Sequence, residues 1–227
     1  MARIVFALFF GLAGVAVLIW LGTWQMQRLA WKEAILADIE QRVAADPVDL
    51  PERPDPVADK YLSVTVTGAL TGPELHVLVS TKEDGAVYRV IQAFDMQGRR
   101  ILVDQGIIPL GAKDAVRAQT NETFTGNLHW PQETDGYTPE PDVRLGIWFA
   151  RDVEKMAREL GTEPVMVVVR RASYSGRDLT PLPVDTASIP NDHLLYAITW
   201  FSLAVVWLVM TGYFLWREAK PKKGKQP

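Results

Sequence analysis

The chain contains two long uninterrupted apolar segments, one near each end. No charged residue occurs in the 24 positions from Ile4 to Gln27, nor in the 23 positions from Leu194 to Trp216. An α-helix crosses the hydrocarbon core of a bilayer with about 20 residues, so each segment is long enough to span it. The first segment is too long for the apolar core of a signal peptide, and no small-residue cleavage motif closes it. We therefore expect a membrane protein with transmembrane helices at residues 4–24 and 191–216.

The sequence between the two segments has the pattern of a small domain rich in strands. Apolar and polar residues alternate along Tyr61–Leu70, which is the period of a half-buried strand. One helix is expected after Asp152, which can cap it, and Gly161 ends it. Its apolar face consists of Val153, Met156, Ala157 and Leu160, and the further strand candidates are Glu74–Ser80, Ala86–Phe94, Arg100–Pro109, Thr123–Trp130 and Val165–Ala172. The pattern predicts a β-rich (α+β) domain of antiparallel strands with one packed helix at residues 25–190, linker included.

The distribution of charge predicts the orientation in the membrane. The segments before, between and after the spans carry net charges of +1, −8 and +4. The basic tail at residues 217–227 marks the cytoplasmic side of the second span, although Arg28 and Lys32 after the first span favour the opposite orientation more weakly. Two spans return the chain to its starting side, which places both termini in the cytoplasm. No Arg-rich transit peptide precedes the first span, so we expect a multi-pass protein of the bacterial inner (plasma) membrane with a periplasmic domain. The tail cations are Arg217, Lys220, Lys222, Lys223 and Lys225.

Composition excludes several functional classes. The chain has no Cys and three His, which rules out disulfide frameworks, thiolate metal sites and covalent attachment of haem. Two of the histidines, His76 and His129, have no second ligand at metal-site spacing and are expected on the surface or satisfied in the core. No nucleophile, metalloprotease or phosphate-loop motif occurs, so we assign no catalytic residue and do not expect an enzyme. The carboxylates are scattered, as on a solvated acidic surface, and an acidic domain argues against nucleic acid as a partner.

His193 is the residue that composition and position single out as a metal ligand. Asn191 is a good N-cap, which places His193 in the first turn of the second span. The positive end of the helix dipole favours a neutral imidazole, which suits iron. Tyr196, Trp200 and Trp207 follow on the same face and form an aromatic wall that a flat macrocycle fits. An interfacial histidine above an aromatic belt explains the same pattern without a ligand, and both interpretations stay open.

The first span carries a matching aromatic face. Trp20, Trp24, Arg28 and Trp31 recur at helical spacing. Because the two helices run antiparallel, Trp24, Gln25 and Arg28 should lie at the level of His193. Arg28 is then a candidate to pair with haem propionates, and ordinary flanking cations are the alternative. Three small residues, Ala7, Gly11 and Gly14, suggest a close contact between the helices.

Two segments resemble the signatures of the Surfeit locus protein 1 family. Residues 21–32 read LGTWQMQRLAWK, similar to L-G-x-W-Q-x-x-R-x-x-W-K, and residues 191–201 read NDHLLYAITWF, similar to N-x-H-x-x-Y-A-x-T-W-F. The segment Val103–Pro109 departs from the family pattern V-N-R-G-W-V-P by lacking its Arg and Trp. The resemblance implies an assembly factor for cytochrome c oxidase that binds haem a and assists its insertion into subunit I. It also implies that His193 ligates the iron, with Tyr196 and Trp200 as aromatic neighbours.

The sequence thus leads to one principal hypothesis and two alternatives. The principal one is a haem a chaperone without turnover, with cofactor-binding residues His193, Tyr196, Trp200, Trp24 and Arg28, and with oxidase subunit I, haem a synthase and membrane lipid as partners. A cofactor-free membrane scaffold that stabilises an early oxidase intermediate is the first alternative. A haem-modifying or quinone-linked membrane oxidoreductase is the second.

Overall fold

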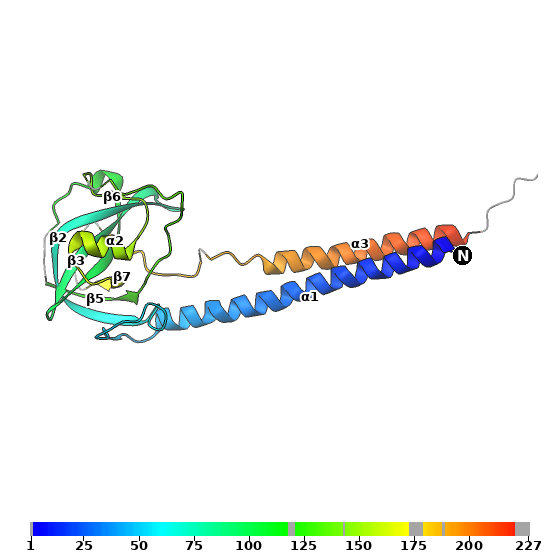
Figure 1. The fold of residues 1–227 in the computed structure, drawn as a ribbon, viewed down its shortest axis with the longest axis horizontal. Helices are drawn as coiled ribbons and strands as arrows, with labels where there is room; N and C mark the ends of the chain where they lie inside the picture. The colour runs from blue at the N-terminus through cyan, green and yellow to red at the C-terminus, as the bar shows by residue number, and fades with distance from the viewer. Residues whose placement is uncertain (1, 118–120, 143, 173–178, 188, 221–227) are drawn as a thin grey trace, which may run out of the picture. The chain divides into compact units, whose positions relative to one another are not determined.

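The computed structural model divides the chain into two compact units. One unit combines Met1–Asp38 with Ala187–Pro227, and the other comprises Ile39–Thr186. Residues 2–117, 121–142, 144–172, 179–187 and 189–220 are described (Figure 1). The tail cations Lys222, Lys223 and Lys225 lie outside the described residues, whereas Arg217 lies in the last helix.

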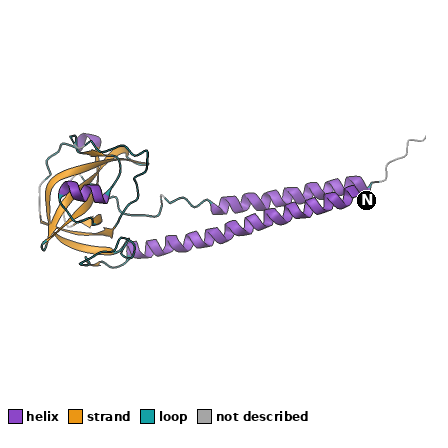
Figure 2. Ribbon diagram, in the orientation of Figure 1, coloured by secondary structure: helices purple, strands orange, loops and turns teal. Residues whose placement is uncertain are grey.

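The first unit is built from two long antiparallel helices, α1 (Ala2–Ala44) and α3 (His193–Ala219). Both are long and apolar enough to cross a membrane, judged by length and composition. Helix α1 continues well beyond its uncharged segment, because residues 28–44 contain no Gly or Pro and are rich in good helix formers. Figures 1 and 2 show α3 lying along the N-terminal part of α1.

Small residues on α1 make the close approach of the two helices possible. A Cβ added at Gly11 would meet the side chain of Thr211, and one added at Gly14 would meet the indole of Trp207. At Gly22 an added Cβ would lie 2.6 Å from a ring carbon of Phe201. The contact expected from Ala7, Gly11 and Gly14 is therefore confirmed at the two glycines, and Gly22 extends it by about two turns beyond Gly14.

The second unit is a closed barrel of five strands. These are β2 (Ser63–Thr81), β3 (Gly85–Met96), β4 (Arg99–Pro109), β7 (Met166–Ala172) and β5 (Asn121–Leu128), in this order. Strand β5 pairs again with β2, which closes the sheet (Figure 2). Two short strands, β1 (Val48–Asp49) and β6 (Ile147–Trp148), pair with β2, and a 3-10 turn, η1 (Leu110–Ala112), follows β4.

The expectation of an antiparallel sheet is corrected, because the sheet is mixed. Strands β4 and β7 are parallel, as are β1 with β2 and β2 with β6, while the other pairs are antiparallel. The long connection from β4 to β7 passes through β5 and helix α2 (Val153–Leu160), and a crossover of this length allows a parallel return. Alternation along one strand predicts a buried face but not the direction of its neighbour, so the sequence did not reveal the parallel pairs.

Two strands expected separately, Tyr61–Leu70 and Glu74–Ser80, are one strand in the structure. Their pairing with β3 shifts register between Thr71 and Glu74, where Gly72 adopts a φ of +72°. Pro73 lacks the N–H that a ladder requires, and a bulge is one of the few places in a sheet that tolerate proline. The Gly-Pro pair that suggested a turn therefore bends β2 without ending it.

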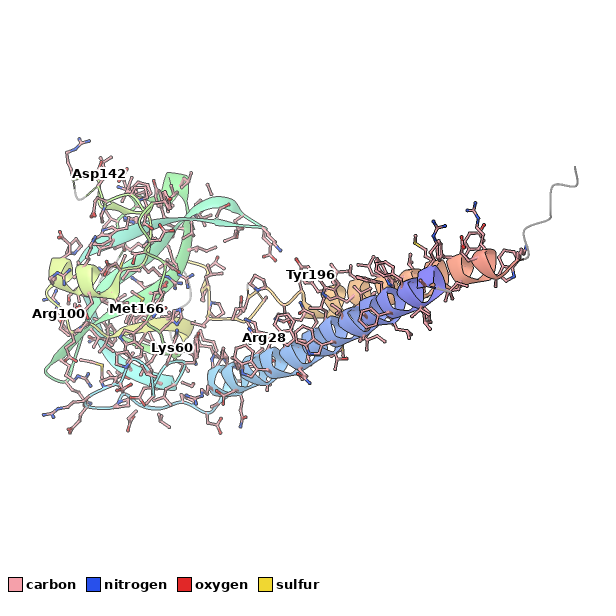
Figure 3. All side chains as sticks on the ribbon, turned by 45° about the vertical axis from the view of Figure 1, so that its right-hand side comes forward. Arg28, Lys60, Arg100, Asp142, Met166 and Tyr196 are labelled. Atoms are coloured by element: carbon pink, nitrogen blue, oxygen red, sulfur yellow. The ribbon has the colours of Figure 1, made fainter. Side chains whose placement is uncertain are left out.

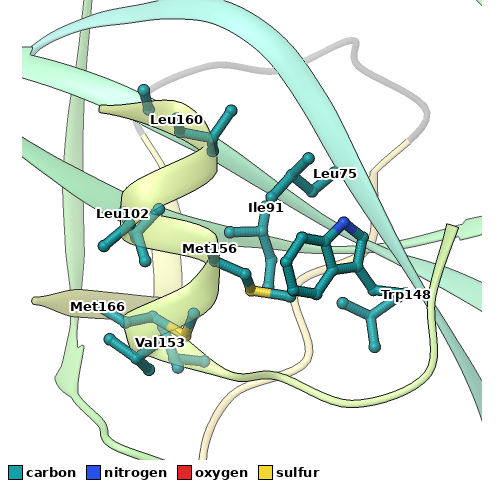
Figure 4. Packing of buried hydrophobic residues seen from close by; sticks show 12 residues of the cluster. Leu75, Ile91, Leu102, Trp148, Val153, Met156, Leu160 and Met166 are labelled. Atoms are coloured by element: carbon teal, nitrogen blue, oxygen red, sulfur yellow. The ribbon is translucent and has the colours of Figure 1, made fainter. Parts of the chain in front are cut away.

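Helix α2 forms as the sequence predicts. The Asp152 side chain accepts a hydrogen bond from the Lys155 N–H at 2.9 Å, and Gly161 ends the helix at a φ of 65°. Its apolar residues are buried in a cluster with Trp148 and Met166 (Figure 4). A second cluster, around Phe94 and Phe124, is formed by strand residues and the segments next to them. The four apolar residues of α2 are Val153, Met156, Ala157 and Leu160.

Candidate functional site on the helix pair

His193 is the first residue of α3. The N-cap is Asp192, whose side chain makes no capping hydrogen bond, so the expectation of Asn191 as the cap is wrong by one residue. The first turn is closed by the Tyr196 N–H, which donates to the Asp192 carbonyl at 3.1 Å. The expected position of His193 in the first helical turn is confirmed. Its side chain is half-buried, which leaves part of the imidazole accessible.

Gln25 on α1 holds one ring nitrogen of His193. The distance from Nδ1 of His193 to Oε1 of Gln25 is 2.8 Å. An amide oxygen only accepts hydrogen bonds, so Nδ1 carries the proton and donates it. In a neutral imidazole the other nitrogen, Nε2, then has a free lone pair. Among the residues that the structure describes, none forms a hydrogen bond with Nε2.

The other four candidate residues occupy different environments. Trp200 is half-buried and shares a helical face with the buried Ala197 and Ala204, so it lies on the side of α3 that packs against α1. Tyr196 is 55% exposed and Trp24 is 44% exposed, and both present aromatic surface outward. Figure 3 labels Arg28 on α1 and Tyr196 on α3.

Arg28 lies next to an aromatic ring. Its guanidinium carbon is 4.6 Å from the centre of the Trp31 ring, a cation–π contact. In the described part of the chain no carboxylate is within ion-pair distance of Arg28. Its charge is thus available to an external anion.

Gln25 lies at the level of His193, as the sequence predicts, but it is not among the five site residues expected from the sequence. The signal was present, because Gln25 lies fourteen positions after Gly11 and three after Gly22, on the same face of α1. A polar amide on the face that packs against another apolar helix needs a hydrogen-bond partner. The only histidine of the second span, at the same level, is that partner.

Comparisons with known proteins find similarity over most of the chain. The model of the SURF1 family matches residues 12–205, which include most of α1, the whole barrel and about the first half of α3. The chain belongs to the SURF1 family. It is 29% identical to the SURF1-like protein of Rickettsia felis over 89% of this chain and 92% of the relative. It is 27% identical to Surfeit locus protein 1 of Rattus norvegicus over 87% of this chain and 71% of the relative.

A large apolar groove of this SURF1-family chain lies away from His193. It has a volume of about 690 Å³, and none of the five candidate residues lines it. Its walls come from the end of the helix pair that carries the N-terminus, and they include Phe6, Phe10, Gly11, Trp207 and Phe214. The lining side chains are apolar or small, apart from Arg3 and Thr211. The groove therefore offers an apolar surface but no metal ligand.

A buried network of charges in the barrel was not predicted from the sequence. The Asp104 carboxylate is fully buried and accepts from Arg89 Nε at 2.5 Å and from Arg151 Nη1 at 3.2 Å. Arg151 also pairs with Glu133, and Arg89 donates to the Leu182 carbonyl. The expectation that the carboxylates form a solvated surface is wrong for Asp104, because two guanidinium groups compensate its burial.

The segment that departs from the SURF1 family pattern, Val103–Pro109, lies in strand β4 and contributes Asp104 to this network. Gln105 replaces the family's Arg, is fully buried, and donates through Nε2 to Gln92 Oε1 at 3.0 Å. Ile107, at the position of the family's Trp, is only 6% exposed. In this chain the segment belongs to the interior of strand β4.

The other two histidines occupy the barrel. His76 is 6% exposed, and its Nε2 is 3.3 Å from Glu74 Oε2, so it is a core histidine with a carboxylate neighbour. His129 stacks on Tyr61 with ring centres 5.5 Å apart. No group of three or more His, Cys, Asp or Glu residues in the described ranges could hold a metal ion. Neither histidine competes with His193 as a candidate ligand.

Replacing Gly22 by Leu should separate the helices of this SURF1-family chain next to Gln25. The new side chain would occupy the volume of the Phe201 ring, and the interaxial distance should increase by about 1–2 Å, since it depends on the side chains at the contact. Because the chain has no Cys, spin labels on cysteines introduced at Val17 and Val205 can report this distance. Gly212→Leu is the matched control, since nothing lies within 4 Å of a Cβ there. An unchanged distance in Gly22→Leu would contradict the packing described.

Proposed function

We propose that the chain is a membrane-anchored assembly factor for cytochrome c oxidase that binds haem a through His193 and delivers it to subunit I. Membership of the SURF1 family supports the assembly role. The observation that carries the proposed cofactor is the imidazole of His193, whose Nδ1 is occupied by Gln25 while Nε2 keeps a free lone pair. A neutral imidazole nitrogen of this kind is the commonest protein ligand of haem iron.

The residues present fit a haem better than a bare metal ion. A bare ion needs several protein ligands, and the described residues provide no group of three. A porphyrin supplies four nitrogens of its own, so one histidine suffices. When bound, haem a would supply an iron that His193 would hold through Nε2. A single protein ligand also suits a carrier, because transfer then requires only one coordinate bond to break.

Three further side chains would contact the cofactor in this proposal. Trp24 and Tyr196 offer exposed aromatic surface on the two helices within one turn of the level of His193, and apolar macrocycles bind to such surface. Arg28 offers a cation without a carboxylate partner among the described residues, which suits a propionate. Trp200 would contribute from the half-buried face of α3.

The proposed location is the bacterial inner membrane, with both termini in the cytoplasm and the barrel in the periplasm. The support is the length and composition of α1 and α3 together with the basic residues after the second span. The candidate site then lies at the outer surface of the membrane. The exposed apolar residues of both helices would face lipid, and the apolar groove near Phe10 and Trp207 would be filled by acyl chains.

Replacing His193 by Ala should remove the cofactor. We expect the wild-type chain, purified in detergent from a host that makes haem a, to retain haem a, and the variant to be colourless. The measurement is the haem content by pyridine haemochromogen together with the reduced-minus-oxidised spectrum. Asp192→Ala is the matched control, since Asp192 is exposed and its side chain makes no capping hydrogen bond. A full haem load and unchanged spectrum in His193→Ala would refute the assignment of the ligand.

The same preparations distinguish the alternative functions. Colourless wild-type protein that still captures oxidase subunit I would support a scaffold without cofactor. Conversion of haem or quinone over many turnovers would support a membrane oxidoreductase. The proposed function instead predicts that haem a leaves the chain once, with no chemical change, when apo subunit I is added.

A further inference from the structure

We propose that Gln25 is a positioning residue that fixes the tautomer of His193 and thereby prepares Nε2 to bind the iron. This inference rests on the proposed role of His193 and extends it to a second residue on the other helix. The observation behind it is the contact of 2.8 Å between Gln25 Oε1 and His193 Nδ1, which joins α1 to α3. Gln25 does not contact the cofactor in this proposal and acts only through the imidazole.

The chemistry of the two groups determines the direction of the effect. A neutral imidazole carries its single proton on Nδ1 or on Nε2, and only the nitrogen without the proton can ligate a metal. An amide oxygen at Nδ1 stabilises the form with the proton on Nδ1. Without that acceptor the proton can occupy Nε2 and block the ligating atom. Metal-binding histidines are commonly oriented in this way, by a carbonyl or carboxylate at the second ring nitrogen.

The packing of the helices explains why Gln25 can do this. The amide is half-buried, on the same face of α1 as the buried Gly22 and Leu29. On α3, His193 begins the face that continues with the buried Ala197. The buried residues of α1 and α3 thus flank the contact between Gln25 and His193. The hydrogen bond from His193 to Gln25 restricts the rotation of the imidazole. The nearby Gln27 is exposed and offers a comparison within the same turn.

The tautomer can be measured without any cofactor. We would label the histidines with ¹⁵N in the full-length apo-protein, in lipid bilayers, and assign His193 by comparison with His193→Ala. The ¹⁵N shifts of the ring nitrogens show which of them carries the proton. We expect protonated Nδ1 in the wild type and in Gln27→Leu, and protonated Nε2 in a large fraction of Gln25→Leu. Gln25→Glu keeps an acceptor oxygen and should restore the wild-type form. An unchanged tautomer in Gln25→Leu overturns the inference.

The consequence for binding is measured separately by titrating purified haem a into the same apo-proteins. Gln25→Leu should weaken binding about 10–100-fold, the usual effect of removing a partner of a metal-bound histidine. Gln25→Glu and Gln27→Leu should remain within about threefold of the wild type, a range well below that loss. A shifted tautomer with unchanged affinity would overturn the positioning role.

The two measurements separate the inference from the proposed function. If the wild type binds haem a no better than His193→Ala, the proposed function fails, whatever the tautomer. If His193→Ala abolishes binding and Gln25→Leu changes neither the tautomer nor the affinity, only the inference fails. A role limited to helix packing would change the melting temperature of Gln25→Leu without changing the tautomer, and this result also counts against the inference.

Discussion

Asp104→Ala is expected to destabilise the barrel by about 3–5 kcal/mol, the usual cost of removing one partner of a buried ion pair. The side chains of Asp104, Arg89 and Arg151 are 0%, 8% and 10% exposed. Without the carboxylate, two guanidinium groups face each other in a region that water reaches poorly. Hydrogen exchange of peptides from β3 and β4, followed through a urea titration of the detergent-solubilised chain, measures the barrel without interference from the helices.

Two further variants make this prediction specific. Asp104→Asn keeps the shape and an acceptor oxygen for Arg89, so it should lose less stability than Asp104→Ala. Asp114→Ala removes a carboxylate that is 96% exposed and 3.5 Å from Lys113, and such a surface pair contributes about 0–1 kcal/mol. If the urea midpoint of Asp104→Ala equals that of Asp114→Ala, the network does not stabilise the barrel.

The features of the fold that the sequence predicted are those set by local pattern. The uncharged segments, the alternation along Tyr61–Leu70 and the cap at Asp152 each describe one element and its own neighbourhood. The features that it did not predict depend on residues far apart in the chain. Closure of the barrel requires β5 to pair with β2, and the parallel pair of β4 and β7 requires a long crossover. No periodicity within one segment contains this information.

The candidate site shows the same division. His193 stands out from composition, because it is the only histidine at the edge of an apolar segment. The role of Gln25 depends on the antiparallel packing of the helices, because this packing brings Gln25 into contact with His193, 168 positions away in the chain. The role of Asp104 likewise depends on Arg89 and Arg151, which come from another strand and from a loop. A lone carboxylate in a sequence resembles any surface residue until its burial is known.

His129 makes the stability of the barrel dependent on pH. Burial is the main cause that lowers the pKa of His129 to about 3 from an ordinary value of 6.5, and the charges of Arg151 and Lys60 act in the same direction. Arg89 also lowers this pKa, whereas Glu133 opposes the shift. The Nδ1 atom is buried and has no hydrogen-bond partner among the described residues. The folded barrel therefore keeps His129 neutral at a pH where the unfolded chain binds a proton.

The sign of this effect follows from proton binding. Between about pH 6.5 and pH 3 the unfolded state holds a proton at His129 that the folded state lacks, so stability falls as the pH falls through this window. Glu133 acts at lower pH. Burial alone would raise its pKa, but the hydrogen bonds and charge of Arg151 outweigh burial and hold it below 4.5. Stability from Glu133 is present above its ordinary pKa and is lost below it, whereas the loss from His129 begins near pH 6.5.

We therefore expect the wild-type barrel to lose about 1.6 kcal/mol between about pH 6.5 and pH 5, because each unit of pH corresponds to about 1.4 kcal/mol for one full proton and the unfolded histidine is half protonated at pH 6.5. His129→Phe keeps an aromatic ring for the stack on Tyr61 and cannot titrate, so its stability should be nearly constant over this range. His129→Gln loses the stack as well, and should show a lower but equally flat profile. Urea titrations read by hydrogen exchange of β5 peptides at several pH values provide the measurement. A decline in His129→Phe as steep as in the wild type would show that another group is responsible.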